Sequence, residues 1–148
     1  MLNCFQPVRT PEQVEIPKGY VGWIRVNFDD STVPPLPTRD GVRIMRIPES
    51  GALATSSHFE EGWAVDRYFY YSSEGLSELH VTGWGEGGMI WGGHSGTGTG
   101  ERGRYHACFF VGTEADLNSA EAQSDRDAKG KFPVPDEPTP GSMRPLAQ

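Results

Sequence analysis

The glycine-rich stretch of residues 83–103 contains the residue pattern of a phosphate-binding loop. Gly98, Gly100 and Gly103 match G-x-G-x-x-G, which binds a pyrophosphate only where it follows a strand and opens a helix. Here the pattern leads into RYHACFFV, an apolar run that predicts a strand. We therefore expect the glycines to serve backbone geometry at bulges and turns, and we expect no nucleotide site.

A second group of residues has the chemistry of a hydrolase. His94 precedes a serine, but HSGTG lacks the G-x-S-x-G pattern of a nucleophile elbow. Upstream, Glu60, Glu61 and Asp66 surround a tryptophan in HFEEGWAVD, and two carboxylates can cleave a glycosidic bond. A hydrolase that uses the loops around residues 58–66 and 94 is the alternative function, and no catalytic residue is assigned.

Two tryptophans of the glycine-rich stretch are candidate ligand-binding residues. Trp84 and Trp91 are expected near one rim together with His94, and exposed tryptophans stack on sugars or on partner side chains. Met89 and Ile90 beside Trp91 predict that Trp91 is buried. The glycines on both sides of Trp84 predict that it is the more exposed of the two.

The spacing of the metal-ligating residue types predicts no metal site and no cofactor. None of the four histidines forms an H-x-H or H-x-x-x-H pair of the kind that zinc sites use. Asp29, Asp30 and Asp40 border a loop with oxygen ligands, but they do not match a calcium-binding EF-hand loop. Aspartate at strand ends is ordinary turn chemistry.

The charge and hydropathy of the chain exclude several classes of partner. The net charge is -7, and an acidic domain without a basic cluster is poorly suited to nucleic acid or to anionic membrane surfaces. No apolar run of about 18 residues is present, so we expect no membrane span.

The two cysteines lead to different expectations. Cys108 lies in an apolar run and is expected to be a small, buried core residue. Cys4 follows Met-Leu-Asn and has two readings: a free cysteine at a frayed end, or the lipid-bearing residue of a lipoprotein whose export signal is incomplete here. The second reading places the protein at the cell envelope, and the first leaves it cytoplasmic.

The elements that must position these residues are strands. Alternation and turn residues predict about seven short strands, hence an all-β antiparallel sandwich, with a short helix after Thr113. The expected strands are residues 20–28, 42–48, 51–56, 66–72, 78–84, 88–92 and 104–113. We expect an N-terminal linker over residues 1–15, the sandwich over 16–116, and a proline-rich disordered tail over 117–148.

Several of these segments resemble a family of bacterial domains of unknown function. The resemblance rests on IPKGYVGWIRVNF, DGVRIMRIPESGALATS, RYFYY, GGMIWGG and the closing FFVGT, and it covers residues 16–113. It implies a small exported or lipid-anchored β-domain, often preceded by a lipoprotein signal, and it carries no activity with it. The expected function is a non-catalytic, envelope-associated binding or interaction module for a protein or carbohydrate ligand.

Overall fold

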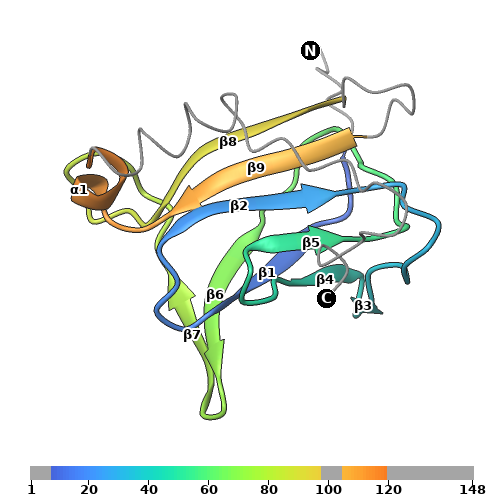
Figure 1. Ribbon diagram of the computed structural model, residues 1–148, viewed down its shortest axis with the longest axis horizontal. Coiled ribbons are helices and arrows are strands. Elements are labelled where there is room, and N and C mark those ends of the chain that lie inside the picture. Colours follow the sequence, from blue (N-terminus) through green and yellow to red (C-terminus); the bar gives the residue numbers. More distant parts are fainter. Residues whose placement is uncertain (1–7, 98–104, 120–148) are drawn as a thin grey trace, which may run out of the picture.

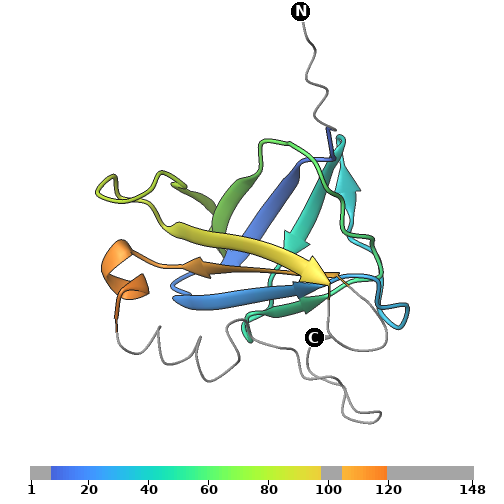
Figure 2. The ribbon, with the colours of Figure 1, turned by 90° about the horizontal axis from the view of Figure 1, so that it is seen from above.

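The computed structural model describes residues 8–97 and 105–119, which form two β-sheets packed face to face and one short helix (Figure 1). The five-stranded sheet has the order β3-β4-β1-β6-β7 and contains β1 (Glu12–Pro17), β3 (Thr38–Arg39), β4 (Val42–Arg46), β6 (Arg67–Ser72) and β7 (Gly75–Leu79). The four-stranded sheet has the order β5-β2-β9-β8 and contains β2 (Gly22–Asn27), β5 (Ala52–Ala54), β8 (Ile90–Thr97) and β9 (Tyr105–Val111). The helix α1 (Glu114–Leu117) follows β9, and Figure 2 shows the two layers from above.

Both sheets are mixed, so the prediction of an antiparallel sandwich was wrong in strand direction. In the five-stranded sheet β1 pairs in parallel with both β4 and β6, and in the other sheet β2 pairs in parallel with β5. The hairpins β3–β4, β6–β7 and β8–β9 are antiparallel, and β9 also pairs antiparallel with β2. The parallel pairs form where the chain crosses between the sheets and returns beside an earlier strand, with β4 and β6 next to β1 and with β5 next to β2.

The centre of the five-stranded sheet is a strand that we expected to be linker. β1 occupies Glu12–Pro17, so residues 12–15 belong to the sheet and not to an N-terminal linker. Its Val14 and Ile16 are buried, and the buried carboxylate of Glu15 pairs with Arg46 at 2.8 Å. The segment alternates for only a few residues and carries two glutamates, which hid its strand character.

Two other strands differ from their expected limits. β7 begins at Gly75, inside the segment expected to be a turn, and it ends at Leu79. β8 runs from Ile90 to Thr97, so it extends beyond the expected strand end at residue 92 into the glycine-rich stretch. Its pairing with β9 shifts register between Trp91 and His94, where the glycines allow a bulge.

The alternation of β2 decides which side chains meet between the sheets. Ile24, Val26 and Phe28 are buried in the main core, whereas Trp23 and Arg25 lie on the opposite face. The main core is formed by residues of both sheets, including Val14, Ile16, Met45, Ile47, Leu79, Phe109 and Val111.

A smaller aromatic cluster covers the outer face of the four-stranded sheet. Trp91 and Phe110 are buried there, and Trp23 and Leu117 pack against them. The predicted helix is confirmed as α1, with the Thr113 side chain accepting a hydrogen bond from the backbone N–H of Asp116. Leu117 therefore belongs to the folded part. The rest of the expected tail, from residue 120, lies outside the described residues, as does Cys4.

Candidate functional site

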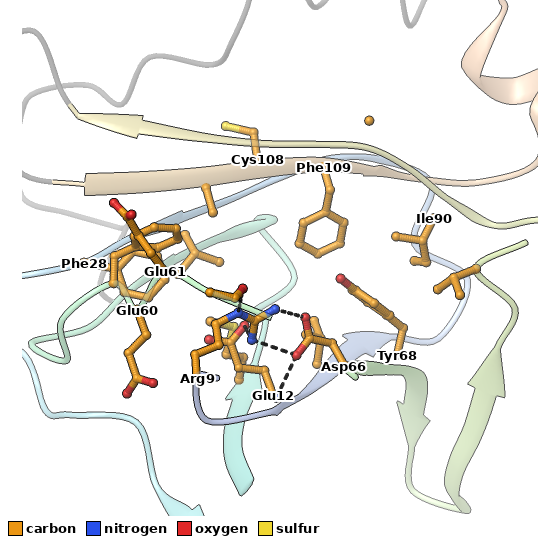
Figure 3. A pocket seen from close by; sticks show the side chains of 18 of the residues that line it. Arg9, Glu12, Phe28, Glu60, Glu61, Asp66, Tyr68, Ile90, Cys108 and Phe109 are labelled. Atoms are coloured by element: carbon orange, nitrogen blue, oxygen red, sulfur yellow. Dashed lines mark hydrogen bonds and ion pairs between the residues drawn. The ribbon is translucent and has the colours of Figure 1, made fainter. Parts of the chain in front are cut away.

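A cleft of about 720 Å³ opens between the two sheets (Figure 3). It is bordered by β1, β4 and β6 on one side, by β2, β8 and β9 on the other, and by the loop that leads into β6. Its inner wall is apolar and combines side chains of both sheets: Val14, Val26, Phe28, Met45, Ile90 and Phe109. Its mouth is charged and includes Arg9, Glu12, Glu60, Glu61 and Asp66.

The mouth is closed on one side by an arginine from the segment that precedes β1. A parallel bridge between Val8 and Trp63 lays this segment against the loop before β6, and the backbone N–H of Arg9 donates to the Trp63 carbonyl. The Arg9 guanidinium then donates two hydrogen bonds to the Asp66 carboxylate, at 2.9 and 2.6 Å. Asp66 also accepts from the backbone N–H of Glu12, at 3.0 Å. The hydrogen bond to Asp66 raises the pKa of Arg9, so the pair stays charged.

A second arginine ties two more carboxylates into the same network. The buried guanidinium of Arg43 donates to Glu12 at 3.0 Å and to Glu60 at 3.3 Å. Burial raises the pKa of Glu12, an effect that Arg43 only partly offsets. The backbone N–H of Thr10 donates to Glu60 and lowers the pKa of that carboxyl. Glu61 lines the mouth as a further, exposed carboxylate, so acids outnumber bases there.

Tyr68 of β6 places a polar group between the charged mouth and the apolar wall. Its ring packs edge-on against Phe109, with ring centroids 5.6 Å apart, and its hydroxyl end points into the cleft (Figure 3). Within the described part of the chain, no hydrogen bond reaches this hydroxyl. Burial, reinforced by the charges of Asp66 and Glu12, raises the pKa of Tyr68 to about 12. The phenol is therefore neutral at physiological pH and can both donate and accept a hydrogen bond.

The tryptophans lie as their neighbours in the sequence predicted. Trp91 is buried, and its Nε1–H donates to the Gly112 carbonyl at 2.8 Å, whereas Trp84 is 58% exposed. Their rings contact each other with centroids 4.8 Å apart. Trp91 also borders the cleft, but Trp84 does not. The backbone of His94 pairs with Cys108, and the side chain of His94 lies outside the described residues.

The structure separates the other candidate residues of the hydrolase. Glu60, Glu61 and Asp66 lie at the cleft mouth, but His58 does not line the cleft. The Nδ1 atom of His58 contacts the carboxylate of Asp29, and the His58 side chain is 87% exposed. No serine or cysteine side chain among residues 8–92 and 105–119 is hydrogen-bonded to it.

Several residues that build the mouth were not predicted from the sequence. Arg9 and Glu12 lie in a segment that was expected to be a linker. Arg43 lies in β4, where most residues are apolar. The alternation of Glu12, Val14 and Ile16 was the available signal, since it places the glutamate on the core face of a strand.

Comparison with known proteins connects this fold to one family and one solved structure. The model of a family of unknown function, DUF6843, matches residues 9–115. A crystal structure described as a "Putative Lipoprotein from Bacillus anthracis" is similar with a TM-score of 0.59 and 18% sequence identity, covering 88% of this chain and 84% of that one. At that identity the likeness shows the fold alone. No curated protein matches the chain. No helix in the described ranges is long and apolar enough to cross a membrane.

Proposed function

This chain belongs to the DUF6843 family of unknown function, and from that premise we propose that it is a non-catalytic binding module of the cell envelope, whose ligand enters the cleft between the sheets. The observation that carries the proposal is the cleft itself. A space of about 720 Å³ with an apolar wall and a few placed polar groups has the size and character of small-molecule sites.

The hydrogen-bonded network at the mouth supports binding rather than catalysis. Asp66 is hydrogen-bonded to Arg9, and Glu12 is hydrogen-bonded to Arg43, so both carboxylates already have a positively charged partner in the protein. Such a fixed set of charges is suited to orienting a ligand. The alternative, a hydrolase centred on His58 and the carboxylates, finds less support because His58 lies away from the cleft.

A neutral apolar dye tests binding in the cleft without reference to charge. One molecule of N-phenyl-1-naphthylamine should bind per protein chain, and the fluorescence of the dye should increase on binding. Ala107, on the core face of β9, lines the cleft, so Ala107→Phe should fill it and reduce dye affinity by about tenfold or more.

The control variant is Ala115→Phe, which adds the same ring on the exposed face of α1 and should bind dye like the wild type. Circular dichroism melts report whether each variant folds, and Ala107→Leu is the smaller substitution if the phenylalanine does not fit. Undiminished binding to a folded Ala107→Phe protein would place the dye elsewhere and contradict the proposal.

Attachment to the envelope is proposed through a lipid on Cys4. The support is the Met-Leu-Asn-Cys start together with a structural neighbour described as a lipoprotein. In a bacterial host that expresses the protein from its native gene and is fed an alkyne-bearing fatty acid, the wild type and Cys108→Ser should be labelled and fractionate with membranes, and Cys4→Ser should not. Label on the Cys4→Ser protein would rule out this anchor.

The exposed face of Trp84 is a second proposed recognition surface, for a carbohydrate or protein ligand. The supporting observation is that Trp84 is 58% exposed yet held against Trp91. An aromatic ring presented at low entropic cost is typical of such surfaces. Binding to a glycan array that is lost in Trp84→Ala but kept in Ala107→Phe would assign the ligand to this surface.

A further inference from the structure

We propose that the cleft selects a small amphipathic cation, with its apolar part between the sheets and an ammonium group at the mouth beside Tyr68 and the carboxylates. This inference rests on the proposed binding function and adds the chemical class of the ligand.

The first argument is the division of the cleft into an apolar and a polar half. Phe28, Ile90 and Phe109 line the inner part, whereas Glu12, Asp66 and Glu61 lie at the mouth. A ligand that is polar throughout would leave hydrogen-bonding groups unpaired against the inner wall, which costs free energy. A ligand that is apolar throughout would cover the carboxylates at the mouth and take water away from them, which also costs free energy. An amphipathic molecule satisfies both halves.

The second argument is the sign of the charge at the mouth. The lining carboxylates are Glu12, Glu60, Glu61 and Asp66, and the cations that face them are Arg9 in the lining and Arg43 behind it. Acids therefore exceed bases by two. An anionic headgroup would enter against this excess, whereas a cationic headgroup would reduce it. The pKa of Glu12 is raised mainly by burial, and the charge of Asp66 adds to that rise.

The third argument is the Tyr68 hydroxyl. It points into the cleft at the boundary of the two halves, and it has no hydrogen bond within the described residues (Figure 3). An ammonium N–H at this boundary donates to the hydroxyl oxygen, and the hydroxyl hydrogen remains available to a carboxylate. A phenol whose ionisation is suppressed by burial keeps this role over the whole physiological range of pH.

The surroundings of the mouth favour the approach of such a ligand. Val8, Trp63, Val65 and Val81 are each more than half exposed, and they belong to the segments that frame the opening. Cys4 is four residues from Val8, so a lipid on Cys4 would be anchored within about 14 Å of this apolar rim. The cleft of an anchored molecule would then open close to the membrane surface, where amphipathic molecules concentrate.

Two detergents with the same tail test the preference for a cation. n-Decylammonium and n-decyl sulfate, each below its micelle concentration, are titrated into the protein and followed by calorimetry and by displacement of N-phenyl-1-naphthylamine. Decylammonium should bind at least about tenfold more tightly than decyl sulfate, and added salt should reduce the difference.

Three variants locate the preference in the cleft. Tyr68→Phe keeps the ring that packs against Phe109 but removes the hydroxyl. The affinity for decylammonium should fall about tenfold because the hydrogen bond is lost. Glu61→Gln should lower the ratio of the two affinities about threefold. Glu49→Gln removes the same charge from an exposed position that does not line the cleft, and it should leave the ratio unchanged.

The outcomes separate this inference from the binding function on which it rests. Equal displacement of the dye by both detergents would overturn the charge preference and leave cleft binding intact. Dye binding that neither detergent displaces would also overturn it, because the amphipathic cation would then have no access to the site. An equal loss of the ratio in Glu61→Gln and Glu49→Gln would attribute the preference to net charge and not to the mouth. Failure of the dye itself to bind would count against both.

Discussion

Replacement of Trp91 by alanine should destabilise the domain far more than the same replacement of Trp84. Trp91 is 6% exposed, lies in the outer aromatic cluster with Phe110, and donates its indole N–H to the Gly112 carbonyl at 2.8 Å. Truncation of a buried tryptophan costs about 3–5 kcal/mol, and the unpaired carbonyl adds about 1 kcal/mol. The free energy of unfolding should therefore fall by about 4–6 kcal/mol, which approaches the whole stability of many small domains.

Trp84→Ala provides the comparison within the same aromatic pair. Trp84 is 58% exposed, and its ring contacts the Trp91 ring, with centroids 4.8 Å apart. The loss of such a contact costs about 0.5–1.5 kcal/mol, so this variant should fold. Trp91→Phe keeps a ring in the cluster but cannot donate to Gly112, and it should fall between the two, at about 1–2 kcal/mol.

Urea denaturation followed by circular dichroism measures all three variants without relying on tryptophan emission. Equal destabilisation by Trp84→Ala and Trp91→Ala would refute the distinction between a buried and an exposed partner. A stable Trp91→Ala protein would refute the assignment of Trp91 to the packed outer face. The intermediate Trp91→Phe result separates the contribution of the hydrogen bond from that of the ring.

Three further predictions concern the mouth and the core. Asp66→Ala leaves Arg9 without its paired carboxylate and should lower the free energy of unfolding by about 1–3 kcal/mol in urea melts, whereas Glu78→Ala, which breaks an exposed pair of the same geometry, should have a much smaller effect. Cys108 is 1% exposed and burial raises its pKa to about 11, so iodoacetamide should modify it about 100-fold more slowly in the native than in the urea-unfolded protein, as read by peptide mass spectrometry; similar rates would remove it from the core. The pKa of Tyr68 is about 12 in the folded chain against an ordinary value of 10.0, so the unfolded state loses this proton first and stability should fall as pH rises above 10; Tyr68→Phe should lessen that fall by up to about 1.4 kcal/mol per pH unit, and identical pH profiles would contradict the burial of the phenol.

The sequence by itself determined the properties that depend on neighbours along the chain. The alternation of β2 placed Ile24 and Val26 in the core, and the apolar setting of Cys108 and Trp91 predicted their burial. The short helix expected after Thr113 is present as α1. A β-strand turns successive side chains to opposite faces, so burial on one face can be derived from local pattern alone.

The tertiary structure alone decided which strands pair and what gathers at the cleft. The parallel partners of β1 arise because the chain crosses between sheets before it returns, and no local pattern records that path. Arg9 and Asp66 are 57 positions apart and meet where the bridge between Val8 and Trp63 lays their two segments side by side. The charge of the mouth and the surroundings of the Tyr68 hydroxyl also depend on residues that are far apart in the sequence. A sequence pattern can therefore place each of these side chains on a face, but only the folded chain brings them to one opening.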